Sequence, residues 1–219
     1  MMVPSPTSEI RSELLSLHPG IPNNMMPQYV WAIERMIKPG LVLDVGCDGS
    51  ILDKYLERRG FEVLCADIDP KAAFYWNGER RDANKFFLID CRRPLTSWHD
   101  KFDYIPIICT LEHIETLEYT GMDSTSPSAP SGWRDCLHLN EDVLMVENLS
   151  RCLKPGGKML ITVNYGEGFA YEGRWKVRCY NENNISRITN TSNLSLTHWH
   201  RDYVEGFLPF FFAELVKHG

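Results

Sequence analysis

This chain contains five short runs of apolar and β-branched residues. Their alternation with amphipathic stretches constrains the fold more than any other feature of the sequence. The stretches at 52–60 and 141–153 carry apolar residues at helical spacing. Strands that alternate with helices favour a parallel sheet covered on both faces, so we predict an α/β fold with three layers. The predicted strands span residues 41–45, 61–67, 85–90, 102–109 and 158–163.

The segments on either side of these strands are expected to add helices and further strands. Two amphipathic stretches precede residue 41, and we expect both to be helices. Towards the C-terminus, residues 181–189 predict a helix capped by Asn181, and 194–200 alternates like a strand. Residues 207–216 fit either a last strand or a short helix.

Length and composition favour one globular domain of 219 residues. The net charge of -6 gives no support to a large basic surface, so we expect no nucleic-acid partner. The longest apolar run, 207–216, is too short to span a bilayer, and no signal peptide is evident, so we expect no membrane partner. The seven cysteines are scattered without a C-x-x-C pair, which fits a reducing cytoplasm.

Acidic residues stand at the ends of the first three predicted strands. Asp44 lies in the first strand and is followed by Gly46, where the backbone can approach a ligand closely. Asp67 ends the second strand, where a carboxylate can accept hydrogen bonds from both hydroxyls of a ribose. Asp90 ends the third, and its carboxylate or the Cys91 amide can face the edge of a base. Because parallel strands end at one edge of a sheet, we expect a ligand site there.

Five segments in order resemble the successive cofactor motifs of class I S-adenosylmethionine-dependent methyltransferases, over roughly residues 41–163. The segments are LDVGCDGS, CADIDP, FLIDC, FDYIPIICTLEHI and LKPGGKMLITV. The resemblance implies a Rossmann-like, mostly parallel seven-stranded sheet whose last strand is antiparallel, and S-adenosyl-L-methionine as cofactor. It also divides the domain into N-terminal helices (1–40), a cofactor-binding core (41–163) and acceptor-side and C-terminal strands (164–219), with a long loop at 116–140.

The resemblance further implies a role for each candidate site residue. Residues after the first strand would lie near the methionine part of the cofactor, Asp67 would hold the ribose, and Asp90 and Cys91 would flank the adenine. Cys109 to His113 would border the methyl-transfer cavity. The candidate cofactor residues are Asp44, Gly46, Cys47, Gly49, Asp67, Ile68, Asp90, Cys91 and Cys109.

The loop after the first strand departs from the family pattern, because Asp48 and Ser50 stand where glycines are usual. Asp tolerates left-handed backbone angles better than most residues, and Gly49 could shift the turn by one residue. An anionic Asp48 beside the cofactor carboxylate would weaken binding unless it points toward solvent or the cationic amino group.

We expect in-line transfer of the methyl group to an O or N atom of a small-molecule acceptor. His113 is the first candidate for a general base, Glu112 the second and His138 the third. A weaker likeness to methyltransferases of sugar and polysaccharide modification makes a sugar one candidate acceptor. The loop 116–140 and the chain after residue 164 are expected to shape the acceptor pocket.

Two other functions compete with this interpretation. A binding or regulatory protein could retain the cofactor pocket without turnover, as the altered glycine loop suggests. A nicotinamide-dependent oxidoreductase is disfavoured, since G-x-G-x-x-G would need glycines at the positions of Asp48 and Ile51. His198 and His200 alone make a weak metal site, so we expect no metal. The aromatic cluster at 207–212 fits a core or a contact in a homo-oligomer.

Overall fold

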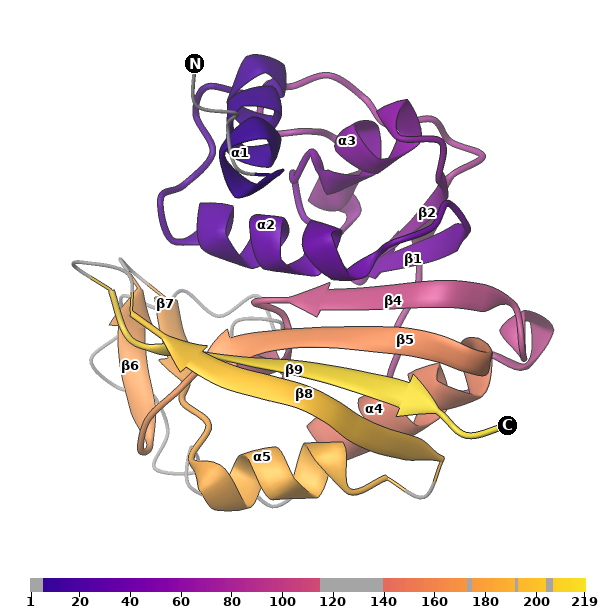
Figure 1. Ribbon diagram of the computed structural model, residues 1–219, viewed down its shortest axis with the longest axis vertical. Coiled ribbons are helices and arrows are strands. Elements are labelled where there is room, and N and C mark those ends of the chain that lie inside the picture. The colour runs from indigo at the N-terminus through magenta and orange to yellow at the C-terminus, as the bar shows by residue number, and fades with distance from the viewer. Residues whose placement is uncertain (1–5, 115–139, 173–174, 192, 204–206) are drawn as a thin grey trace.

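The computed structural model of the protein describes residues 6–114, 140–172, 175–191, 193–203 and 207–219. Within these residues, seven strands form one sheet in the order β3-β2-β1-β4-β5-β9-β8 (Figure 1). The first five strands in this order run parallel, whereas β9 is antiparallel to both β5 and β8. The predicted α/β sheet with an antiparallel last strand is confirmed. The strands are β1 (Leu41–Val45), β2 (Glu62–Asp67), β3 (Phe86–Leu88), β4 (Phe102–Ile108), β5 (Leu153–Asn164), β8 (Leu194–Asp202) and β9 (Phe210–Lys217).

Helices cover both faces of the sheet, as Figure 1 shows. Helices α1 (Pro6–Leu17), α2 (Met25–Arg35) and α3 (Leu52–Arg58) lie on one face, and they enclose a core with one side of the strands. Helices α4 (Glu141–Cys152) and α5 (Glu182–Thr189) enclose a second core on the other face. Since both faces are covered, the central strands are mostly apolar, which made them visible in the sequence.

Most predicted elements lie within a few residues of their expected positions. Asn181 caps α5 as predicted, because its side chain accepts a hydrogen bond from the Asn184 amide at 3.0 Å. Residues 207–216 resolve in favour of a strand, since β9 pairs with β5 and β8.

The segment 153–157 differs from the prediction. A helical stretch was predicted to end at residue 153 and a strand to begin at residue 158, but β5 already begins at Leu153. The pairing of β5 with β4 shifts its register between Phe102 and Tyr104, so the glycines are accommodated inside the strand as an irregularity. Gly156 takes a positive φ of 77° there.

A hairpin of β6 (Phe169–Glu172) and β7 (Trp175–Arg178) was not predicted. It lies beside the edge of the sheet toward which β4 and β5 point (Figure 1). The chain between β2 and β3 also lacks a long helix and contains only a 3-10 turn at Pro70–Ala73. This irregular segment carries Trp76 and Arg81, both of which contact the loop after β1.

Candidate functional site

Two adjoining cavities lie at the ends of β1, β2 and β4, where the order of the strands reverses. The larger, of about 510 Å³, extends toward the start of α2. The smaller reaches the end of β3, and Gly46, Asp67 and Thr110 line both cavities. Eight candidate cofactor residues line one or both: Asp44, Gly46, Cys47, Asp67, Ile68, Asp90, Cys91 and Cys109. The ninth, Gly49, lines neither.

Asp44 presents a buried carboxylate to the larger cavity. Its Oδ2 atom has no hydrogen-bond partner among the described residues. Burial raises the pKa of Asp44 to about 7; the Arg81 charge opposes this rise, and Asp53 and Asp67 add to it. A carboxylate in this position favours a cationic ligand group, because such a group would supply the missing donor and stabilise the charge.

Asp67 holds the end of β2 to the loop that follows β1. Its Oδ2 accepts the Asp48 amide at 2.9 Å, and its Oδ1 accepts the Asp69 amide at 2.9 Å. Burial raises the pKa of this carboxyl, while the amide hydrogen bonds lower it. Each carboxylate oxygen can accept a second hydrogen bond, so Asp67 can also receive ribose hydroxyls between the two cavities.

Asp90 lines the smaller cavity with Cys91, but its carboxylate already has a partner. Arg92 donates from Nε at 2.8 Å and from Nη2 at 2.9 Å, and this pairing lowers the pKa of Asp90. Arg93 lies 3.6 Å away. The sequence did not indicate that its neighbours would neutralise this acid, because adjacent charges in a loop usually point into solvent.

The loop after β1 turns at Asp48, which adopts the left-handed conformation with φ at 39°, in line with the tolerance of Asp for such angles, whereas Gly49 does not adopt it. The prediction that Gly49 shifts the turn is therefore wrong. Gly49 serves close packing instead, because a Cβ there would lie 2.1 Å from Cδ1 of Trp76. The exposed Asp48 carboxylate accepts Nε1–H of Trp76 at 3.0 Å, which holds it at the rim of the larger cavity.

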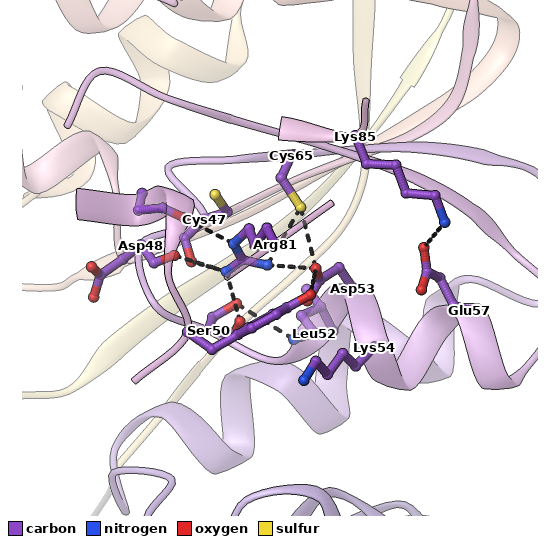
Figure 2. A network of polar contacts seen from close by, with 12 residues as sticks. Cys47, Asp48, Ser50, Leu52, Asp53, Lys54, Glu57, Cys65, Arg81 and Lys85 are labelled. Carbon is purple, nitrogen blue, oxygen red and sulfur yellow. Dashed lines mark hydrogen bonds and ion pairs between the residues drawn. The ribbon is translucent and has the colours of Figure 1, made fainter. Parts of the chain in front are cut away.

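Arg81 supports this loop from behind, and no sequence motif indicated its role. Its guanidinium is buried and donates from Nη2 to the carbonyls of Asp48 (2.8 Å) and Ser50 (2.7 Å), as Figure 2 shows. Nη1 pairs with Asp53 of α3, whose Oδ2 also accepts the hydroxyl of Tyr75 at 2.7 Å. Figure 2 shows the Asp48 carboxylate pointing away from the guanidinium, so the loop is held through its backbone.

The two leading candidate bases differ in position. His113 lines the larger cavity, and burial lowers its pKa, partly opposed by the charge of Asp48. A neutral imidazole at pH 7 can accept a proton. Glu112 is 0% exposed and lines neither cavity, so its proposed role as the second base does not fit the structure. In the 3-10 turn Leu111–His113, neighbouring side chains point in different directions. His138 lies outside the described residues.

Other side chains of the larger cavity were missed in the sequence. Tyr29 of α2 and Trp76 line it, and no motif marked either residue. Cys109 has a positive φ of 48°, and its thiol donates to Oε1 of Gln28 at 3.0 Å. These residues come from segments far apart in the chain, so spacing could not reveal that they meet.

His198 and His200 lie on β8, with ring centroids 5.6 Å apart, and His200 stacks on Phe212. Among the described residues, no group of three His, Cys, Asp or Glu side chains is arranged to hold a metal ion.

None of the helices in the described residues has the length and apolar character that crossing a bilayer requires.

The sheet order and the acidic strand ends at the cavities define a class I, Rossmann-like S-adenosylmethionine-dependent methyltransferase. The chain belongs to the methyltransferase domain family, whose profile matches residues 28–203. No curated protein matches the sequence at a significant level.

Solved structures share the fold at low sequence identity. A protein from Pyrococcus horikoshii aligns with a TM-score of 0.61 and 18% identity, over 97% of this chain and 92% of that one. The 1,6-didemethyltoxoflavin-N1-methyltransferase of Burkholderia thailandensis, with bound 1,6-didemethyltoxoflavin and S-adenosylhomocysteine, aligns with a TM-score of 0.61 and 15% identity, over 100% of this chain and 93% of that one. The N-methyltransferase NodS of Bradyrhizobium japonicum, in complex with S-adenosylhomocysteine, aligns with a TM-score of 0.58 and 13% identity, over 97% of this chain and 99% of that one.

S-adenosylmethionine is the cofactor of this chain, and the cavities fit it at two points. The unpartnered, buried Oδ2 of Asp44 is suited to its ammonium group. Gly46 lines both cavities, and a Cβ there would lie 2.3 Å from side-chain atoms of Thr110, which also lines both. A larger residue would therefore displace Thr110 and change the shape of both cavities.

Proposed function

We propose that this methyltransferase transfers the methyl group to an O or N atom of a small-molecule acceptor bound in the larger cavity. The observation that carries the proposal is the position of His113, which lines that cavity and not the smaller one. The volume of about 510 Å³ is large enough for the methionine part of the cofactor together with a small acceptor.

Each part of the site has a distinct task in this proposal. S-adenosylmethionine supplies an activated methyl group on a sulfonium. Asp44 binds its ammonium group, Asp67 binds its ribose hydroxyls, and the smaller cavity with Cys91 takes its adenine. His113, neutral at pH 7, accepts the proton that an acceptor hydroxyl or amine loses. Holding the acceptor in line with the methyl group accounts for the rest of the catalysis.

The charge of the larger cavity limits which classes of acceptor can bind there. Among the described residues, its lining contains Asp44, Asp48, Asp67 and Asp69 and no Lys or Arg. Since the cofactor occupies Asp44 and Asp67, the other two carboxylates are left near the acceptor. They would repel a phosphate or carboxylate and tolerate a neutral or cationic molecule. Amines and neutral polyols, including sugars, meet this condition, and two of the solved neighbours are described as N-methyltransferases.

The test uses deuterated-methyl S-adenosylmethionine and separate pools of amines, neutral polyols and organic acids. We expect mass spectrometry to find the labelled methyl group in the amine or polyol pool, and the His113→Ala variant to lose that product. Labelling confined to organic acids would contradict the proposal. Tight cofactor binding without any labelled product would favour a binding or regulatory protein instead.

The cellular setting is also part of the proposal. In the described part of the chain, Cys47, Cys65, Cys91 and Cys152 are free thiols. Free thiols support a reducing compartment such as the cytoplasm.

A further inference from the structure

The loop between β1 and α3 bears a side chain at a position where the methyltransferase pattern has glycine. Asp48 adopts φ of 39° there, in the left-handed region that L residues rarely occupy. Some other interaction must hold the loop in this conformation. Arg81 is the buried group that contacts the loop backbone on the side away from the Asp48 carboxylate (Figure 2).

The contacts of Arg81 are directed at the backbone of the loop. Nη2 donates to the carbonyl of Asp48 at 2.8 Å and to that of Ser50 at 2.7 Å, with the Cys47 carbonyl at 3.5 Å. Nε donates to the carbonyl of Ala72 at 2.9 Å. One guanidinium therefore ties the loop to the chain that follows β2.

These contacts also fix the direction of the loop amides. In a trans peptide the carbonyl and the next N–H point in opposite directions. Since the Cys47 carbonyl faces Arg81, the Asp48 amide points the other way, and it donates to Asp67 at 2.9 Å. Arg81 and Asp67 thus hold one peptide from both sides, and that peptide directly follows Gly46 and Cys47 at the larger cavity.

The guanidinium is itself held in place. Its ion pair with Asp53 is buried on both sides, and Tyr75 lies under the guanidinium at 4.3 Å from the ring centroid. The Asp53 oxygen in this pair also accepts the Tyr75 hydroxyl and the Cys65 thiol. A lysine could not reproduce this arrangement, because its single ammonium lacks the planar set of five donors.

We propose that Arg81 is a positioning residue for S-adenosylmethionine, holding the Asp48-containing loop in the conformation that glycine would otherwise permit. The inference rests on cofactor binding at this loop. The affinity for S-adenosylmethionine then depends on a buried cation that lines neither cavity.

Arg81 also acts on Asp44 through its charge. The groups that influence the Asp44 carboxyl are Arg81, which lowers its pKa, and Asp53 and Asp67, which raise it, in addition to burial. Without the Arg81 charge, burial, Asp53 and Asp67 remain, and each of them raises the pKa of Asp44. Cofactor binding, which needs the Asp44 carboxylate, should then be lost at a higher pH than in the wild type.

The experiment measures the affinity for S-adenosylhomocysteine by calorimetry between pH 5.5 and 8.5. We expect Arg81→Gln to weaken binding by roughly tenfold or more at pH 7.5, since two charge-assisted hydrogen bonds to the loop are lost. The acid limb of the affinity profile should move to higher pH. Adding Asp48→Gly should recover about threefold or more, because glycine adopts the left-handed conformation without support.

Two control variants separate positioning from stability. Leu56→Ala removes a fully buried side chain of α3 that lines neither cavity and should lower the melting temperature with little change in affinity. Arg81→Lys keeps the charge and provides the test if Arg81→Gln does not fold. It should weaken binding while leaving the acid limb in place.

Several results would overturn the inference. These are unchanged affinity in folded Arg81→Gln or Arg81→Lys, an equal loss in Leu56→Ala, or failure of Asp48→Gly to recover binding. If the wild type itself did not bind S-adenosylhomocysteine, the methyltransferase function would fail. If the wild type bound and the Arg81 variants bound equally well, only the inference about Arg81 would fail.

Discussion

The two cavities of this methyltransferase are built from different kinds of structure. The smaller is lined mainly by residues at the ends of β1, β2 and β3, together with Thr110 and Ile114 after β4 and Met145 of α4, so the sheet itself fixes where most of them lie. The larger adds side chains from the start of α2 and from the irregular chain after β2, including Tyr29 and Trp76. A cofactor common to a whole family can be bound by strand ends and backbone, whereas an acceptor is recognised by side chains from elements that vary. The predictions below test whether this division holds.

The largest change in activity is expected from a substitution of His113, next to the proposed acceptor. His113→Ala should lower kcat by roughly 10²- to 10⁴-fold, the usual contribution of a general base. It should leave the affinity for S-adenosylhomocysteine nearly unchanged, because the proposed contacts of the cofactor are with Asp44, Asp67 and the smaller cavity, which His113 does not line. Since burial lowers the pKa of His113, kcat of the wild type at saturating S-adenosylmethionine should stay level near pH 7 and fall only in more acidic solution.

Steady-state kinetics and calorimetry on the same preparation check this prediction. His99→Ala is the matched control, since His99 is exposed and lines neither cavity. An unchanged kcat in His113→Ala would mean that alignment alone carries the reaction.

A substitution where the cavities meet should affect both of them. Gly46→Ala should weaken cofactor binding by about 100-fold, because the new Cβ would lie 2.3 Å from Thr110 and the residue has φ of 68°. The left-handed conformation alone costs about 1–2 kcal/mol.

Gly78→Ala isolates that backbone cost, since Gly78 has φ of 82° and open space around its Cβ position. Calorimetry and thermal unfolding of both variants measure the difference. Equal affinities in the two variants would show that the close approach to Thr110 is unimportant.

Asp44→Asn separates cofactor binding from stability. Affinity should fall about tenfold above pH 7, because a charge-assisted hydrogen bond is lost. The pKa of Asp44 is raised from its ordinary value of 3.8 to about 7 in the folded protein, so its contribution to stability is fully present below about pH 4 and is lost as the pH rises from there to about 7.

Above pH 7, the Asp44→Asn apoprotein should therefore be more stable than the wild type, by up to about 4 kcal/mol in the free energy of unfolding, and should unfold at a higher temperature. Thermal unfolding at pH 5 and pH 8 checks the sign. A variant less stable than the wild type at pH 8 would contradict the unpartnered state of this carboxylate.

The smallest effect is expected at Asp90. Asp90→Asn should change the affinity by less than about threefold, because Arg92 already holds the carboxylate and a partly exposed pair contributes about 0–1 kcal/mol. Asp67→Asn is the comparison, with an expected loss of about tenfold. A loss above tenfold at Asp90 in calorimetry would show that its carboxylate contacts the cofactor directly.

The sequence by itself determined the sheet and the positions of the acids at its edge. Buried strands such as β1 are short apolar runs, and their ends converge because parallel strands share an edge, so Asp44 and Asp67 could be placed without coordinates. The cap of α5 by Asn181 was equally local.

Only the tertiary structure decided how the site is completed. Arg81 reaches the loop after β1 from more than 30 residues away, and no spacing rule links two such segments. Glu112 and His113 are neighbours in sequence, yet one is buried outside the cavities and the other lines the larger one. Local hydrogen bonds and periodic burial are encoded over a few residues, whereas contacts between irregular segments depend on how the whole chain packs.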